Sequence, residues 1–409
     1  MRRSQQFSRM FGVLAVVALL FPIVSCPALA SSDPWVRSYE AGSFTVANDM
    51  IVVDNGLVIA GLSRTAIGDR LTRARLLKID LSGDVVWDHV YSNRGGSAEG
   101  IIERSDGSYL ACGFVASEAG DQDIYLLCVD ANGQELWSRE WGASLGEYVH
   151  GIQPTADGGS ILVGNIVDPE DMIVDPGTPG YDGYAGRSNP LIVKLDADDQ
   201  VAWSRQLVHP GNVLAAAIRP KLDGGYVVLA RELMFPIGRS EMLLYQLDAE
   251  GEQLNLTRWM DGSTRGYDLQ ATPDGCFLIA GAWTAVGEAK GDASLWKVTA
   301  DGREQWVCHF GDPEHLETAN VVAVGNDGNI YTAGWRMVGY DSPEDEDAVV
   351  SAFDADGVLM WQKSVASYQH MMFAGIAQLS DQDLALAISV FPRWGNRYIE
   401  GIRTTSRAE

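Results

Sequence analysis

Four polar side chains occupy one position of an internal repeat and could together form a ligand site. Counting seven residues back from a recurrent turn acid or its equivalent gives, in chain order, Ala47, Glu99, His150, Ala216, Tyr267, Asn320 and Ala374. If these positions share one level of a channel, Glu99, His150, Tyr267 and Asn320 converge there. Convergent polar groups bind and orient small ligands. The alternative is a channel rim that is polar only because it is solvated.

A second set of candidate ligand residues lies in one acidic segment. It contains Asp168, Glu170, Asp171 and Asp175. Carboxylate oxygens are the ligands that calcium prefers, and long loops on rigid scaffolds often carry function. Their spacing does not follow the EF-hand pattern. A calcium site at these four acids is therefore a hypothesis beside a plain solvated acidic loop, and no other cofactor is expected.

The elements that would position these residues repeat along the chain. A tryptophan marks each repeat, at Trp35, Trp87, Trp137, Trp203, Asn255 in place of tryptophan, Trp306 and Trp361. The period is near 50 residues, which is in the range of propeller blades. Each period contains four short runs rich in β-branched and aromatic residues, which predict four strands. One longer period indicates an acidic insertion near residues 166–189.

Two kinds of turn separate these runs. Asp-Gly or Asn-Gly pairs, such as Asp106-Gly107, stand between the first and second runs and predict type I′ hairpin turns. Asp-x-x-Gly stands between the third and fourth runs, as in Asp130-Ala-Asn-Gly133. There the aspartate side chain is expected to cap the turn and the glycine to close it.

The two ends of the repeat region complement each other. Residues 35–39 read as an isolated fourth run, whereas residues 396–405 read as a third run with no fourth after it. The sequence therefore predicts an all-β, seven-bladed β-propeller of four-stranded blades, with the N-terminal strand closing the last blade. An open right-handed β-solenoid is the rival architecture.

The repeat motif, DGGYxxxG followed by YLxKLDxxGxxxW, resembles the bacterial secreted β-propeller repeat family. That family is related to the quinoprotein-like (PQQ-like) propellers and to outer-membrane-assembly lipoproteins. The resemblance covers roughly residues 35–405 and implies a fold more than a function, because propellers host unrelated activities. The chain has no adjacent cysteine pair, and its repeats centre on DGGY, so a quinone site is not expected.

Residues 1–30 have the pattern of a secretory signal peptide, which leaves residues 31–409 as a single propeller. Arg2 and Arg3 precede an apolar run at 11–24, which is shorter than the roughly 20 residues that span a bilayer. Residues 28–30, Ala-Leu-Ala, fit ordinary signal cleavage, whereas Cys26 fits the lipobox of a bacterial lipoprotein. We therefore expect a secreted, periplasmic or cell-surface protein without a transmembrane helix in the mature chain, and a lipid anchor at Cys26 is the alternative.

The net charge of the chain indicates which classes of partner it can bind. The chain has 55 acidic against 30 basic residues, a formal charge of −25, which disfavours nucleic-acid binding. No catalytic residue is singled out. The expected function is a binding or assembly module that presents a face to a protein partner, a small ligand or a glycan. The alternative is an enzyme, a hydrolase or lyase acting on extracellular polysaccharide at the channel mouth.

Overall fold

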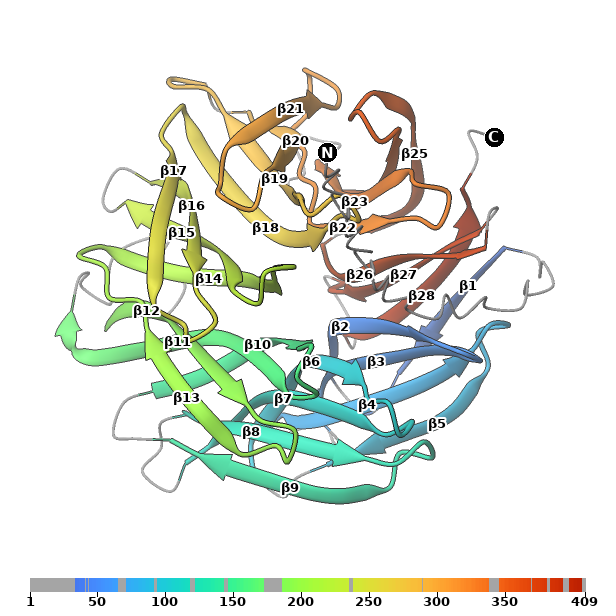
Figure 1. Cartoon of the computed structure of the whole chain (residues 1–409). Helices are drawn as coiled ribbons and strands as arrows, with labels where there is room; N and C mark the ends of the chain where they lie inside the picture. The colour runs from blue at the N-terminus through green and yellow to red at the C-terminus, as the bar shows by residue number, and fades with distance from the viewer. Residues whose placement is uncertain are drawn as a thin grey trace, which may run out of the picture.

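The described part of the chain forms a ring of seven antiparallel four-stranded sheets around a central axis (Figure 1). The computed structural model describes residues 34–406 except 41, 43, 65–70, 92–93, 118–121, 143–145, 173–185, 235–237, 289, 338–345, 369, 381–382 and 393–396. Those described residues contain no helix, so none there could cross a membrane. The predicted seven-bladed propeller is confirmed, and the solenoid is excluded.

The strands follow the chain from the axis outwards in each blade. Blades 1 and 2 are β2 (Phe44–Val53), β3 (Gly56–Arg64), β4 (Arg73–Asp80), β5 (Val85–Val90), and β6 (Gly96–Glu103), β7 (Tyr109–Ala116), β8 (Gln122–Val129), β9 (Glu135–Trp141). Blades 3 and 4 are β10 (Gly146–Pro154), β11 (Ser160–Met172), β12 (Gly186–Leu195), β13 (Val201–Gln206), and β14 (Asn212–Pro220), β15 (Tyr226–Met234), β16 (Arg239–Leu247), β17 (Gln253–Trp259).

The remaining blades have the same order. Blades 5 and 6 are β18 (Ser263–Ala271), β19 (Phe277–Thr284), β20 (Asp292–Val298), β21 (Glu304–Phe310), and β22 (Val321–Val324), β23 (Ile330–Met337), β24 (Glu346–Phe353), β25 (Leu359–Tyr368). Blade 7 is β26 (Met371–Ser380), β27 (Asp383–Val390), β28 (Tyr398–Thr405) and β1 (Trp35–Tyr39).

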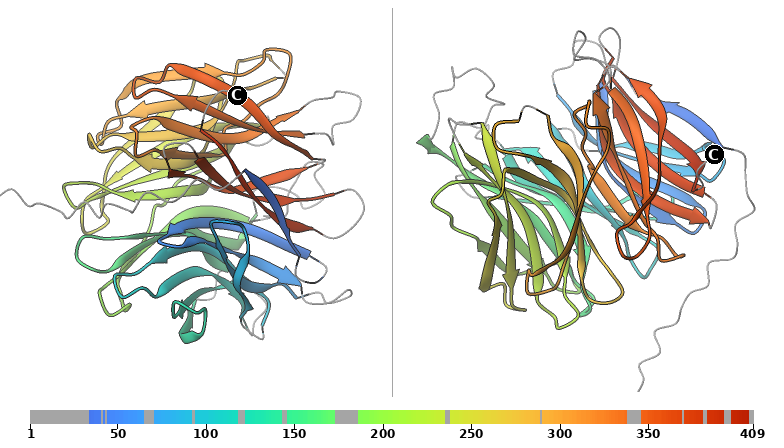
Figure 2. Two further views of the ribbon diagram at one scale, coloured as in Figure 1. Left: turned by 90° about the vertical axis from the view of Figure 1, so that its right-hand side faces the viewer. Right: turned by 90° about the horizontal axis from the view of Figure 1, so that it is seen from above.

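Strand β1 closes the ring. It pairs antiparallel with β28, from Trp35 opposite Arg403 to Tyr39 opposite Ile399, and so supplies the outer strand of blade 7. Figure 2 shows this blue strand beside the red strands in side view. The expected closure is confirmed. A ladder of backbone hydrogen bonds holds β1 in blade 7, and the chain continues from β1 into β2 of blade 1, so the first and last blades are linked.

The second and third strands are buried on both faces because blades stack face to face. In β27 every residue is buried, and most residues of β3 and β16 are buried as well. Outer strands alternate instead, as in β13. This distribution explains why the central runs of each repeat are apolar throughout, whereas the fourth run is polar at every second position.

An outer belt of tryptophans holds neighbouring blades together. The indole Nε1–H of Trp35 donates to the carbonyl of Leu81 in the next blade, and that of Trp87 donates to Ala131, each at 3.0 Å. The rings of Trp203 and Trp306 lie under the corresponding turns, against Gly251 and Gly357. These four tryptophans therefore pack on the turn between the third and fourth strands of the following blade.

Those turns have the predicted chemistry. In the first, Oδ1 of Asp80 accepts hydrogen bonds from the N–H groups of Ser82 and Asp84, and the Gly83 N–H donates to the Asp80 carbonyl. The same bonds recur from Asp130, Asp196, Asp248 and Asp354. The aspartate caps the turn with its own side chain, and glycine closes it with a positive φ.

One of these turns lacks the glycine. Asp199 takes its place with φ 58°, the only non-glycine residue with positive φ in the described ranges. Its carboxylate accepts a hydrogen bond from Arg104 Nη1 of the neighbouring blade at 2.7 Å. Aspartate tolerates the left-handed region better than most residues, and the ion pair supplies a contact between blades that glycine could not make.

The type I′ prediction for the first hairpins is wrong. In blade 2, the Gly107 N–H donates to the Arg104 carbonyl and the Arg104 N–H donates to Ser108, so the loop has five residues. Positive φ occurs at Gly107 and not at Asp106, whereas a type I′ turn needs it at both central residues. The aspartate accepts the Ser108 N–H instead, as in the other turns.

Candidate functional site

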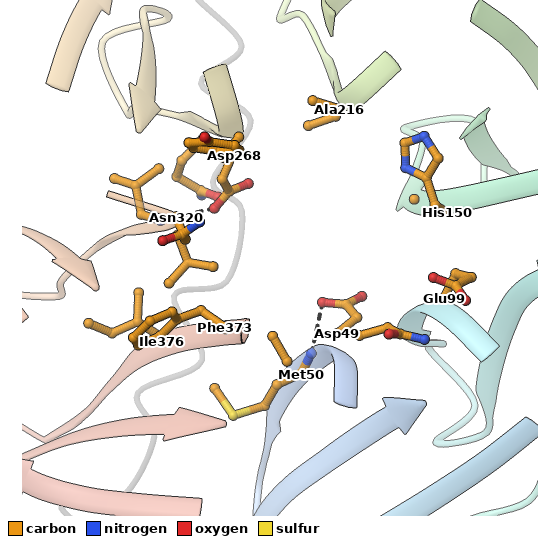
Figure 3. Close-up of a pocket in the computed structure, with 18 of the residues that line it drawn as sticks. Asp49, Met50, Glu99, His150, Ala216, Asp268, Asn320, Phe373 and Ile376 are labelled. Carbon is orange, nitrogen blue, oxygen red and sulfur yellow. Dashed lines mark hydrogen bonds between the residues drawn. The ribbon is translucent and has the colours of Figure 1, made fainter. Parts of the chain in front are cut away.

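The axis of the ring contains a cavity of about 270 Å³, lined by the first strand of every blade (Figure 3). Six of these strands carry a β-bulge at one level, seen as register shifts between Ala47 and Asp49, Ala98 and Gly100, Val149 and Gly151, Ala215 and Ala217, Gly266 and Asp268, and Phe373 and Gly375. In blade 6, Asn320 directly precedes β22. A bulge leaves one residue unpaired and changes the direction of its side chain.

The six bulged residues and Asn320 line the cavity. In chain order these residues are Asn48, Glu99, His150, Ala216, Tyr267, Asn320 and Ala374. The structure therefore brings together Glu99, His150, Tyr267 and Asn320, as the repeat count predicted, and Figure 3 shows three of them, Glu99, His150 and Asn320, around the central space.

The prediction for blade 1 is off by one residue. Ala47 is buried in the blade, and its N–H donates to Ser389 Oγ of blade 7. The cavity receives Asn48 instead, whose Nδ2 donates to Ser97 Oγ. The reason is the hairpin that follows: β2 and β3 join through two residues, because Val53 pairs with Gly56, so a count from the turn acid starts at the wrong place.

Burial favours the neutral form of both Glu99 and His150, so it shifts their pKa values in opposite directions. Burial raises the pKa of the Glu99 carboxyl to about 6, against a hydrogen bond from Ser97 that favours the ionised form. Burial lowers the pKa of the His150 imidazole to about 4, so this side chain is neutral at pH 7. Its Nε2 has no hydrogen-bond partner among the described residues. A carboxyl that titrates near neutral pH thus shares the cavity with a neutral imidazole.

Two further carboxyls line the cavity and were missed by the sequence count. Asp49 accepts hydrogen bonds from the N–H groups of Met50 and, in the next blade, Ile101. Asp268 makes the same pair of bonds with Leu269 and Val322. Each therefore ties two blades together beside the axis. The available signal was an acid just after the counted position: Asp268 directly follows Tyr267, whereas Asp49 lies two residues after Ala47, because the count in that repeat is off by one.

The cavity is acidic. Asp49, Glu99 and Asp268 line it together with one guanidinium, that of Arg219, whose Nη2 lies 3.4 Å from Asp268 Oδ1. Burial raises the pKa of Asp49 to about 7, and it also raises the pKa of Asp268. The negative charge of the cavity therefore develops as the pH rises through neutrality. Groups that donate hydrogen bonds or carry positive charge are the ones this lining can bind.

The proposed calcium ligands lie elsewhere. The backbones of Asp168, Glu170 and Asp171 belong to the end of β11, their side chains are not among those described, and Asp175 lies outside the described residues. Around them, residues 166–168 and 186–189 pair as strands β11 and β12. Within the described ranges no group of three His, Cys, Asp or Glu side chains could hold a metal ion. Cys26 also lies outside the described residues.

One segment matches the sequence pattern of a catalytic motif but lies in a different structural context. Residues 142–146, Gly-Ala-Ser-Leu-Gly, fit the G-x-S-x-G pattern of the nucleophile elbow. That elbow joins a strand to a helix, whereas this segment joins the strands β9 and β10 of neighbouring blades. Residues 143–145 lie outside the described part, and the surrounding topology does not support an elbow.

Comparison with known proteins gives the fold. No family model matches the chain, and no curated protein matches it. Among solved structures it is similar to puromycin hydrolase (TM-score 0.53, 13% identity, covering 87% of this chain and 51% of that one), and to its S511A mutant complexed with PGG (TM-score 0.50, 13% identity, 88% and 50%). The chain thus spans about half the length of that hydrolase.

A third similar structure is the β-propeller domain of the Trilobed protease from Pyrococcus furiosus (TM-score 0.50, 12% identity, covering 89% of this chain and 96% of that one). That domain is described as having an open velcro topology, whereas β1 closes the ring here. At these identities the likeness shows the propeller fold and nothing about activity.

Proposed function

We propose that this chain is an extracytoplasmic binding module whose axial cavity receives a small group with positive charge, an ammonium or a guanidinium. The supporting observation is the convergence of Asp49, Glu99 and Asp268 on one cavity with a single arginine beside them. The cavity volume of about 270 Å³ suits a small ligand or one inserted side chain of a protein partner. Both carriers would present the same chemistry to these carboxyls.

The wider setting rests on the sequence. The apolar run near the N-terminus supports export, with cleavage after Ala30 or lipidation at Cys26, and the repeat motif supports kinship with bacterial secreted, quinoprotein-like propellers. Placement in the periplasm, at the cell surface or in the medium is part of the same proposal. Mass spectrometry of the mature N-terminus separates the two cleavage routes.

The polar lining contributes specificity. Asn48, Tyr267 and Asn320 place amide and phenol groups at the level of Glu99. These groups accept as well as donate hydrogen bonds, so they can orient a ligand without adding charge. Neutral His150 adds no positive charge to that of Arg219 at pH 7.

Methylguanidinium and its neutral isostere N-methylurea test this proposal. We expect the wild-type protein to bind methylguanidinium, by isothermal titration calorimetry, and to bind N-methylurea at least about tenfold more weakly. Affinity should rise from pH 5 to pH 8, because the pKa values of Glu99 and Asp49, about 6 and about 7, lie inside that range. Equal affinity for both probes, or none for either, would exclude a cation site at the axis.

Glu99→Gln supplies the matched variant. The substitution keeps the shape and a hydrogen-bonding group while removing the charge, and Glu99 has no ion-pair partner in the described residues that would be left unpaired. We expect methylguanidinium affinity to fall about tenfold and the remaining pH dependence to follow Asp49. Ala374→Ser, which adds one hydroxyl at the same level, should leave the charge preference unchanged.

A second candidate, a hydrolase or lyase on extracellular polysaccharide, is favoured by one observation. Asp49 and Glu99 both have raised pKa values, so either carboxyl could keep a proton near neutral pH, as a general acid must. A screen of acidic and neutral polysaccharides with the wild-type protein and Glu99→Gln separates the candidates. Turnover that disappears in the variant would favour the enzyme.

A further inference from the structure

A second polar cavity, of about 400 Å³, lies where blade 4 meets blade 5. Arg239 begins β16 and Arg265 is the third residue of β18, and both line it (the two strands are labelled in Figure 1). Ser263 and Thr284 add hydroxyl groups, Glu288 adds one carboxylate, and Leu316 adds an apolar wall. The residues come from two blades and from the segment before β22, so only the assembled ring creates this cavity.

Neither arginine has an ion-pair or side-chain hydrogen-bond partner within the described part of the chain. Arginines nearby are paired: Arg258 lies 2.8 Å from Glu241, and Arg219 contacts Asp268. In a chain with a net charge of −25, carboxylates are abundant, and nine of the arginines in the described ranges form an ion pair with one. Two unpaired guanidinium groups on one cavity therefore form a local excess of positive charge.

The chemistry of the lining favours an oxyanion. A guanidinium presents parallel N–H donors that match the two oxygens of a carboxylate or phosphate. The Ser263 hydroxyl oxygen accepts the Ser240 N–H at 3.2 Å, which leaves its own proton free to donate into the cavity. With Glu288 ionised, the two arginines leave a net charge of +1 at the cavity. At physiological ionic strength, the negative field of acidic residues farther than about 8 Å from the cavity is largely screened.

We propose that this cavity, named here the rim cavity, binds the carboxylate or phosphate group of a small organic anion through Arg239 and Arg265. The site is separate from the axial cavity and does not depend on the function proposed for it. The cavity between the turns of blades 5 and 6 offers a contrast: its cation, Lys297, is already paired with Asp274 at 2.8 Å.

Titration calorimetry with three probes tests the rim cavity: glucuronate, inorganic phosphate and neutral glucose, at constant ionic strength. We expect one or both anions to bind and glucose not to bind. Arg239→Gln and Arg265→Gln should each weaken anion binding by at least about tenfold, and the double variant should abolish it. Tighter glucuronate binding would assign the site to organic carboxylates, and tighter phosphate binding would assign it to phosphorylated ligands.

Matched controls separate binding from folding and from overall charge. Arg303→Gln removes one positive charge from an exposed side chain away from the cavity, and Glu99→Gln alters the axial cavity alone. Both should bind the anions as the wild type does, and thermal unfolding should show that every variant is folded. No anion binding by the wild type up to about 10 mM, or unchanged binding by a folded double variant, would overturn the proposal.

Discussion

The outer belt and the axial bulges repeat in different ways. In the outer belt the residue type recurs: Trp35, Trp87, Trp203 and Trp306 pack under the next blade's turn. At the axis the backbone geometry recurs while the residue type changes, from Glu99 to His150 to Tyr267. The belt residues therefore repeat one structural contact between neighbouring blades. The bulges hold different side chains at equivalent places, as a ligand site requires.

The largest effect is expected from removing a belt tryptophan. Trp87 is buried and contacts Tyr109 of the next blade, and its Nε1–H bonds to Ala131. Trp87→Ala should lower the free energy of unfolding by about 3–5 kcal/mol, and Trp87→Phe by about half of that, because the ring is partly kept while the hydrogen bond is lost. Urea denaturation measures both. A cost below about 1 kcal/mol for the alanine variant would contradict the structural role of the belt.

Substitutions at two glycines test how tightly the belt tryptophans pack on the turns of the next blade. Gly251 and Gly224 both have positive φ, +81° and +91°, so alanine strains the backbone at either position. At Gly251 the added Cβ would also lie 2.6 Å from the Trp203 ring, whereas at Gly224 it meets nothing within 4 Å. Gly224→Ala should cost about 1–2 kcal/mol and Gly251→Ala clearly more. Equal melting temperatures for the two variants would show that the Trp contact is loose.

At the axis, a pH-dependent effect is expected from Asp49. Its pKa in the folded protein, about 7, is above that of an unfolded aspartate, so the folded state binds the proton more tightly. This contribution to stability is fully present below about pH 4 and is lost as the pH rises through 7, with a slope of up to about 1.4 kcal/mol per pH unit.

Asp49→Asn removes that titration. The variant also loses an acceptor for the N–H of Met50 or Ile101, so it should be less stable than wild type by about 1–3 kcal/mol. The difference in unfolding free energy between the two proteins should be largest at pH 5 and smaller at pH 8. His150, whose pKa is lowered, titrates in both proteins and cancels in this comparison. A difference that does not vary with pH would assign Asp49 an ordinary pKa.

The smallest effect concerns calcium, away from both the belt and the axis. If Asp168, Glu170, Asp171 and Asp175 hold an ion, added Ca²⁺ should raise the melting temperature by a few degrees, in proportion to the logarithm of its concentration. Replacing these four acids by asparagine or glutamine should remove the response. A melting temperature that does not respond to calcium would count against a calcium site at these four acids.

Much of the fold could be predicted because its signals are local. The Asp-x-x-Gly turns are held by hydrogen bonds within five residues, as around Asp80, so the sequence alone specifies them. The complementary ends, residues 35–39 and 396–405, predicted the closing strand, because the last repeat lacks the fourth run that every other repeat has and the first residues supply one. Predictions failed where a small local difference mattered, as at Ala47, where a shorter hairpin shifted the count by one.

The sequence by itself determined the period, the strands and the Asp-x-x-Gly turns, because these depend on spacing and on bonds between near neighbours. It also indicated the closed ring, because its two ends complement each other. Tertiary structure decided the chemistry of the two cavities. Asp49 and Asp268 lie far apart in the chain, and the ring arrangement of the blades brings them to one cavity. Arg239 and Arg265 lie on neighbouring blades, and the packing of those two blades brings them to the other. The raised pKa of Asp49 has the same origin, because it arises from burial, and burial is a property of the assembled blades.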